Sequence, residues 1–199
     1  MKVKNEQLED LIVKLRAREE AAPLSPKQPW REELDTDIAA LVLAEPRGTL
    51  AIALKCGLHL LNDSIDLAHG YAQQIEHDAT GAYWHGIIHH MEHDYSNAKY
   101  WLYASGKHAA SRQLEEQAFR WLKEESDWTS AAEGKVKDAI EGLAAGSRWN
   151  ALLFVDAIAL QESGVGSEQT YRILQHVQGI EIQALFDYTL AAAVQAGQA

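Results

Sequence analysis

Side chains that could bind a metal or transfer a proton recur within one short segment, Tyr83–Trp101, with the sequence YWHGIIHHMEHDYSNAKYW. If this segment is helical, His85, His89 and Glu92 stand at positions i, i+4 and i+7, within about 60° of one another at roughly 100° per residue. Neutral imidazole nitrogens one turn apart can close on a single zinc ion. The spacing therefore suggests a metal site, although imidazole and carboxylate groups are also common on solvated helix faces.

A second polar stripe precedes this segment, on a helix that the pattern predicts over residues 49–77. Seven polar side chains share one side of that helix: His59, Asn62, Asp63, Asp66, His69, Gln73 and His77. The short connection at 78–81 predicts that the two helices are antiparallel neighbours, so the two stripes could meet. Asp66 and His69 have the carboxylate-x-x-His form of di-iron bundles, but no second motif of this kind is present and a full di-iron site is not expected. From this stripe we take His69, Asp63 and Asp66 as candidate catalytic groups.

One further carboxylate interrupts a later apolar run. Glu181 lies near the middle of a long helix predicted over residues 167–196, where a buried carboxylate is costly unless it is paired or ligated. Glu181 is therefore a candidate additional metal ligand beside the three residues of the central segment.

These groups support two mechanisms and one non-catalytic alternative. In the first mechanism His85, His89 and one or two carboxylates hold a divalent metal: zinc, iron or manganese. The metal activates water or polarises a small-molecule substrate. In the second no metal is bound, and one histidine acts as a general base oriented by Asp63 or Glu92. The alternative is a small-molecule-binding or scaffold protein whose polar stripes face water. Polar stripes of this kind more often belong to such proteins than to enzymes.

The other residues of the central segment have less specific roles. His90 and His93 point away from the predicted metal-binding face and are expected at the surface. The aromatic residues that follow, Tyr100, Trp101 and Tyr103, are assigned to the core, where two of them could also line a pocket.

Four blocks of the chain fit a family pattern: Leu61–His69, Tyr83–Trp101, Phe154–Asp156 and Glu181–Asp187. They resemble an uncharacterised family of helical proteins whose central motif reads roughly YWHxIxHRREPDxSNxKYW, and only this central block is specific. The chain departs from the motif at His90, Met91 and His93, where the family has two arginines and a proline or glycine. The family has no assigned activity. The resemblance implies a helical fold and gives weight to five residues without supplying a reaction: His69, His85, His89, Glu92 and Asp94.

The composition and the stop signals along the chain predict an all-α fold. From Trp30 onward the sequence is rich in Ala, Leu, Glu, Gln and Lys and has few alternating β-branched runs. Glycine and proline turns separate the segments, Ser130–Glu133 has the form of a capping box, and Ser167 is a candidate N-cap. We expect helices near 33–44, 49–77, 82–93, 97–104, 109–125, 130–145, 149–162 and 167–196. This pattern is typical of a single-domain helical bundle.

The N-terminal residues predict a helical arm. Four apolar residues recur at i, i+3, i+4 and i+7 on a helix within residues 4–20: Leu8, Leu11, Ile12 and Leu15. A connector from Pro23 to Pro29 follows, so we divide the chain into an arm with its connector, residues 1–29, and a helical bundle domain, residues 30–199. An isolated helix of this length is marginal in water, so the stripe needs a partner surface on its own bundle or on a second chain. We favour the second chain, in a homodimer.

The overall composition argues against several classes of protein. The chain has 199 residues, a net charge of -11 and a single cysteine, Cys56, which excludes an internal disulfide. The charge argues against nucleic acid as a partner, because binding to phosphates depends on Lys and Arg. No apolar run approaches the roughly 18 residues of a membrane span, and the first residues lack the apolar region of a signal peptide. We expect a cytoplasmic protein with a small-molecule ligand and no membrane partner.

Overall fold

The computed structural model describes residues 5–43 and 48–197 of the chain. Within these ranges the chain forms ten α-helices and no strand, which confirms the predicted all-α fold. The helices are α1 (Glu6–Arg16), α2 (Glu32–Ala40), α3 (Thr49–Leu61), α4 (Ile65–Ala72), α5 (Ala79–Met91), α6 (Tyr95–Ala104), α7 (Ser111–Arg120), α8 (Lys135–Ala145), α9 (Ala151–Leu160) and α10 (Glu168–Gln195). Short 3-10 or π-helical turns lie at Gln73–Ile75, Trp121–Glu125, Trp128–Ser130 and Gln161–Val165. None of the described helices is both long enough and apolar enough to cross a membrane.

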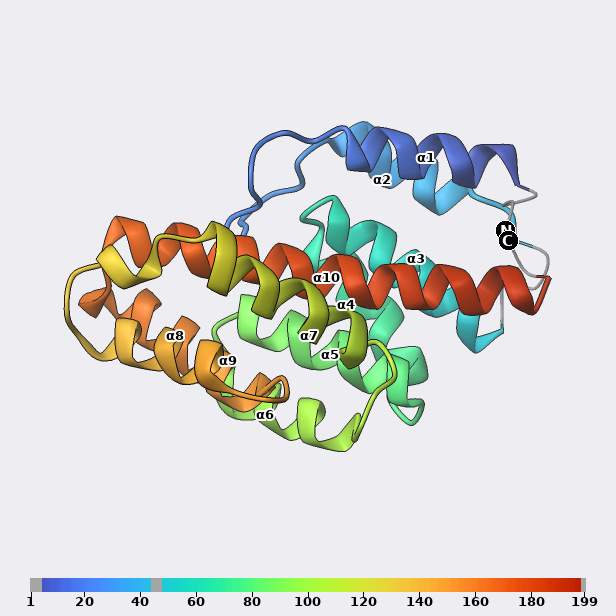
Figure 1. Ribbon diagram of the computed structural model, residues 1–199. Coiled ribbons are helices and arrows are strands. Elements are labelled where there is room, and N and C mark those ends of the chain that lie inside the picture. Colours follow the sequence, from blue (N-terminus) through green and yellow to red (C-terminus); the bar gives the residue numbers. More distant parts are fainter. Residues whose placement is uncertain (1–4, 44–47, 198–199) are drawn as a thin grey trace.

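The longest helix, α10, runs along the length of the molecule, with α1 and α2 above it in the view of Figure 1. It packs against α3, α5 and α7. A capping box begins it, because the hydroxyl of Ser167 accepts the N–H of Thr170 and the hydroxyl of Thr170 accepts the N–H of Ser167. This confirms the N-cap that the sequence predicts at Ser167.

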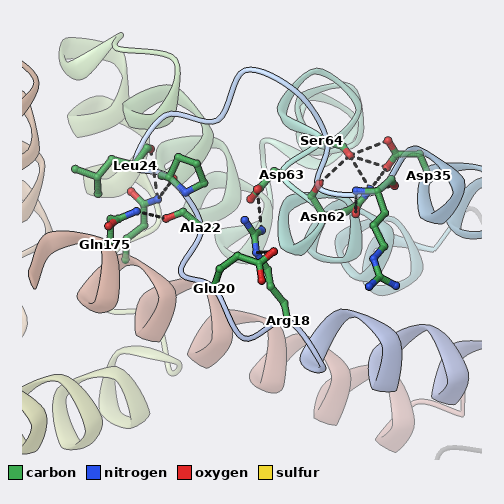
Figure 2. Close-up of polar contacts among 12 residues, drawn as sticks. Arg18, Glu20, Ala22, Leu24, Asp35, Asn62, Asp63, Ser64 and Gln175 are labelled. Atoms are coloured by element: carbon green, nitrogen blue, oxygen red, sulfur yellow. Dashed lines mark hydrogen bonds and ion pairs between the residues drawn. The ribbon is translucent and has the colours of Figure 1, made fainter. Parts of the chain in front are cut away.

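The prediction of one helix over residues 49–77 is wrong, because the chain turns a corner at Asn62–Ser64 between α3 and α4. Asp63 has a φ of 62°, a left-handed conformation that does not continue a helix. Asn62 Nδ2 and Ser64 Oγ both donate to Oδ1 of Asp35 on α2, at 3.0 and 2.6 Å (Figure 2). Asn, Asp and Ser side chains compete with the helix hydrogen bonds in this way, which is the physical reason for the break.

Other helix boundaries also differ from the prediction. The capping box expected at Ser130–Glu133 is wrong, because residues 128–130 form a separate 3-10 turn and α8 begins only after Gly134. Asp78, expected to end a helix, instead begins α5, since its Oδ1 accepts the N–H of Thr80 at 2.8 Å.

The N-terminal helix and its connector pack on the body of their own chain. The four residues of the α1 stripe are between 0% and 7% exposed and belong to the main core. Leu24, the second residue of the connector, is fully buried in a second part of the core, and the amide of Gln178 donates to its carbonyl at 3.3 Å. The stripe thus has its partner surface within the same chain. This removes the reason that favoured a second chain, and the homodimer remains a prediction without this support.

Candidate metal centre

Helices α4, α5 and α6 position the residues of the central segment. Residues 73–78 connect α4 to its neighbour α5, and α6 packs along α5. Gly86 allows the close approach of α6, since a Cβ at this position would lie 2.6 Å from Cγ of Leu102. As a result α5 is buried on nearly all sides.

Three histidines from α4 and α5 converge at this place. His85 and His89 are only 4% and 7% exposed, so these two residues of the stripe are buried and do not face water. The side chain of His69 is 20% exposed. One ring nitrogen from each of the three residues lies within 4.8 Å of the others. Nε2 of His69 and Nε2 of His85 are 2.9 Å apart.

Glu92, which caps the C-terminal end of α5, lies between two of these histidines. Its Oε1 is 2.8 Å from Nδ1 of His69, and its Oε2 is 3.4 Å from Nδ1 of His89. Burial opposes ionisation of this carboxyl, but the contacts and charges of the two histidines outweigh it and lower the pKa of Glu92 to about 2. The hydrogen bond to Glu92 in turn raises the pKa of His69. Glu92 thus contacts Nδ1 of His69, whereas His85 contacts Nε2 on the other side of the same ring.

The pKa of His85 is shifted in the opposite direction. Burial, followed by the nearby rings of His89 and His69, lowers the pKa of His85 to about 4. At neutral pH His85 is therefore uncharged, while His69 holds a proton more readily. Two titratable groups in contact whose pKa values are pushed apart are typical of an acid–base pair. The cluster can accordingly serve proton transfer as well as metal binding.

Two residues of α6 complete the surroundings of the cluster, and the sequence identified neither as part of the site. Trp101 stacks on His85, with ring centroids 4.5 Å apart and 25° between the planes. Nδ2 of Asn97 lies 3.1 Å from Nε2 of His89. The N-cap of α6 is Asp94, whose Oδ1 accepts the N–H of Asn97. The available signal was the i, i+4 spacing of Asn97 and Trp101, which matches that of the two histidines on α5.

The two predicted catalytic acids, Asp63 and Asp66, make no hydrogen bond to the cluster among the described residues. Asp66 is exposed in the first turn of α4, and its charge contributes to the raised pKa of His69. Asp63 lies at the corner before α4, where its Oδ2 is 2.7 Å from Nη1 of Arg18. The corner places Asp63 outside α4, the helix that carries His69.

Glu181 belongs to a different buried group. Its Oε1 accepts hydrogen bonds from the hydroxyl of Tyr83 at 3.0 Å and from Nε1 of Trp149 at 3.1 Å, and its Oε2 is 4.0 Å from Nε2 of His90. Burial raises the pKa of Glu181 to about 7. His90, expected at the surface, is fully buried because α9 and α10 also pack against α5. Glu181 is therefore not placed to join the three clustered histidines in one ligand set.

Comparisons with known proteins do not assign the chain to a family. No family model, no curated protein and no solved structure matches it. The candidate site therefore rests on its own geometry, which combines three converging imidazoles, a carboxylate hydrogen-bonded to one of them, and partial exposure at His69 and Glu92.

Proposed function

We propose that this protein binds a divalent transition metal through His69, His85 and His89 and uses the metal to activate water for a reaction on a small molecule. The observation that carries the proposal is the convergence of three ring nitrogens within 4.8 Å of one another. Two of these nitrogens, on His69 and His85, are 2.9 Å apart. Two ligands of a tetrahedral zinc ion lie about 3.3 Å apart when each is about 2.0–2.1 Å from the metal. Small ring rotations would therefore bring both nitrogens to ligand distance from one ion.

Glu92 supports the proposal as the partner of a metal ligand. A metal-bound histidine usually donates its other ring N–H to a carboxylate, which fixes the tautomer and the orientation of the ring. Glu92 accepts from Nδ1 of His69 at 2.8 Å, and this leaves the lone pair of Nε2 directed toward His85. We therefore assign Glu92 to this orienting role in place of the ligand role that the sequence suggested.

The tautomer of His89 depends on Asn97. An asparagine amide can present either its oxygen or its nitrogen to a neighbour. When the oxygen of Asn97 faces Nε2 of His89, that nitrogen carries the proton and Nδ1 has a free lone pair. Nδ1 of His89 is buried and has no hydrogen-bond partner among the described residues. Oε2 of Glu92 is 3.4 Å from this atom, and a metal ion bound there would replace this long contact with a direct bond.

The ligand set favours zinc. Imidazole nitrogens suit zinc and iron, whereas manganese prefers oxygen ligands. Catalytic zinc sites typically use three protein ligands and keep a fourth position for water, which the metal makes a strong nucleophile near neutral pH. The side chains of His69 and Glu92 are 20% and 28% exposed, so solvent reaches this side of the cluster.

Titration of zinc, and of cobalt as a coloured substitute, into metal-stripped protein without a histidine tag tests the proposal. We expect one tightly bound ion per chain in the wild type and a loss of affinity of about tenfold or more in His85→Ala. His77→Ala is the matched control, because the side chain of His77 is 97% exposed. Equal zinc affinity in the wild type and in His85→Ala would refute the proposal.

A metal-free acid–base role is the second candidate, and it rests on the contacts from Glu92 through His69 to His85. These contacts are 2.8 and 2.9 Å long, and the pKa of His69 is raised while that of His85 is lowered. His69 would then act as a general base oriented by Glu92. Protein that binds no zinc, but in which NMR shows His69 titrating above the usual histidine pKa, would favour this candidate.

A further inference from the structure

The residues that follow α1 cover a cavity that is separate from the histidine cluster. Its volume is about 420 Å³, within the usual range of small-molecule pockets. Its walls are the end of α1 with residues 18–22, the C-terminal end of α3, and α10 from Gln175 to Gln183. Each wall contributes apolar side chains, among them Leu15, Leu60 and Ile180.

A buried ion pair forms part of the cavity wall. Nη1 of Arg18 donates to Oδ2 of Asp63 at 2.7 Å, and the two side chains are 11% and 4% exposed (Figure 2). Oδ1 of Asp63 has no hydrogen-bond partner among the described residues. A buried carboxylate oxygen without a donor is unfavourable. The carboxylate therefore has the capacity to accept a hydrogen bond from a bound molecule.

The backbone holds Asp63 in an uncommon conformation beside the cavity. Its φ of 62° is rare for residues other than glycine, although Asn and Asp adopt it more readily than most. The flanking residues Asn62 and Ser64 fix the corner through their bonds to Asp35. Strained residues that are held in this way are frequent at ligand sites.

Gly179 leaves room in the α10 wall of the cavity. A glycine inside a helix is less favourable than alanine, so it usually has a packing reason. Gly57 on α3 has one, because a Cβ there would lie 2.8 Å from Phe186. A Cβ at Gly179 would meet no atom within 4 Å. Packing within the chain does not explain this glycine, and the open space beside it belongs to the cavity.

We propose that the cavity binds a small apolar molecule that carries a protonated primary amine, with the ammonium group donating to Oδ1 of Asp63. Three carboxylates and two guanidinium groups line the cavity: Glu19, Glu20, Asp63, Arg16 and Arg18. Arg16 also pairs with Asp187, which is outside the lining, so the lining is net negative. A cation balances this charge, and the apolar walls bind the rest of the molecule. This inference does not depend on the proposed metal.

Binding of 2-phenylethylamine to the full chain, measured by calorimetry, tests the chemistry of the ligand. The matched analogues are 2-phenylethanol, which is uncharged, and 3-phenylpropanoate, which is an anion. We expect one amine bound per chain, binding of the alcohol weaker by about tenfold or more, and no binding of the anion. Absence of amine binding, or an anion that binds as well as the amine, would overturn the proposal.

Two variants test the location of the amine. Asp63→Asn removes the charge but keeps a residue that tolerates the left-handed conformation, and Gly179→Leu fills the cavity without a clash at Cβ. We expect amine binding to weaken by about tenfold or more in D63N and to be lost in G179L, while the Tm of G179L is not lowered. Ala191→Leu adds the same side chain at an exposed position of α10 outside the cavity, and it should bind the amine like the wild type. Unchanged amine affinity in G179L would refute the site.

Discussion

Neighbouring groups give the histidines of α5 properties that differ from those of a free histidine. Burial and two nearby rings lower the pKa of His85 to about 4, and burial lowers the pKa of His90 to about 3. Because an unfolded histidine binds a proton near pH 6.5, these two groups make the folded chain less stable as the pH falls below about 6.5. The raised pKa of Glu181 makes the folded chain more stable as the pH falls through part of the same range. A comparison of variants therefore separates the contribution of Glu181 from that of the histidines.

Glu181→Gln should change the pH dependence of stability. The folded chain holds the Glu181 proton up to about pH 7, whereas the unfolded chain releases it from about pH 4.5. As the pH rises from about 4.5 to about 7, ionisation of Glu181 therefore costs the wild type roughly 3 kcal/mol of stability, at about 1.4 kcal/mol per pKa unit. Glutamine has no proton to release and still offers an oxygen to Tyr83 and Trp149. In urea unfolding, the variant should match the wild type near pH 4.5 and exceed its stability at pH 8; parallel profiles would contradict this prediction.

Glu92→Gln should weaken metal binding while the helices stay folded. The substitution removes the charged partner of His69, and loss of such a partner typically lowers metal affinity about 10- to 100-fold. Competition with a coloured zinc chelator measures the change. Glu76→Gln, in the turn before α5, is the control. The orienting role of Glu92 fails if the two variants bind zinc equally.

At the scale of the helices, the sequence predicts which residues share a face of one helix. It does not predict the contacts that form only when two helices pack together. His85 and His89 share a face because helix spacing places them one turn apart. Asn97 and Trp101 reach them only because α6 packs closely on α5, which requires a residue without a side chain at Gly86. A glycine in a helical pattern has many explanations, so this contact cannot be predicted from the sequence.

The corner between α3 and α4 was missed for a related reason. Apolar periodicity continues on both sides of Asn62–Ser64, and this pattern favours one uninterrupted helix. Helix α3 ends there because the corner forms hydrogen bonds with the residues just before α2. Asn62 Nδ2 donates to the carbonyl of Arg31 at 2.9 Å, and the N–H of Trp30 donates to the carbonyl of Asn62 at 2.7 Å. The run of Asn, Asp and Ser is the local signal for a corner, whereas the apolar periodicity around it favours a continuous helix.

Gly86→Ala should disturb the packing of α6 on α5. The added Cβ would lie 2.6 Å from Cγ and 3.0 Å from the backbone nitrogen of Leu102, so α6 must shift. Overpacking of this kind costs about 1–3 kcal/mol of stability, and zinc affinity should fall as Asn97 moves away. Gly70→Ala is the control, because its Cβ would meet nothing within 4 Å, and it should be neutral or stabilising by up to about 1 kcal/mol. Equal Tm values for the two variants would argue against this close packing.

Across the whole molecule, the N-terminal segment joins parts of the chain that are distant in sequence. Arg16 pairs with Asp187 on α10, and the amide of Gln175 donates to the carbonyl of Ala22, just before the connector, at 3.0 Å (Figure 2). Periodicity predicts the α1 stripe, since it depends on residues of one helix. The surface that receives the stripe depends on the combined shape of several helices, which periodicity does not describe.

Leu8→Ala should destabilise the protein within a single chain. Leu8 is fully buried, and truncation of a buried leucine costs about 2–5 kcal/mol. Val13→Ala is the control on the same helix, because Val13 is 63% exposed and should cost less than about 0.5 kcal/mol. Urea unfolding at two protein concentrations gives the measurement, and the loss in Leu8→Ala should be the same at both. A loss that grows on dilution would show that the stripe docks on a second chain.

The contact between α1 and α10 also sets an order of events during synthesis. Arg16 and Asp187 are separated by 171 positions in the chain. At about 5–20 residues per second, a ribosome takes roughly 10–30 seconds to cover that distance. During this interval α1 can meet α2 and α3, its other neighbours, but not α10, so its packing is incomplete. A segment that stabilises the finished fold is therefore exposed to aggregation while the chain is being made, and we expect it to be a binding site for chaperones that hold nascent chains.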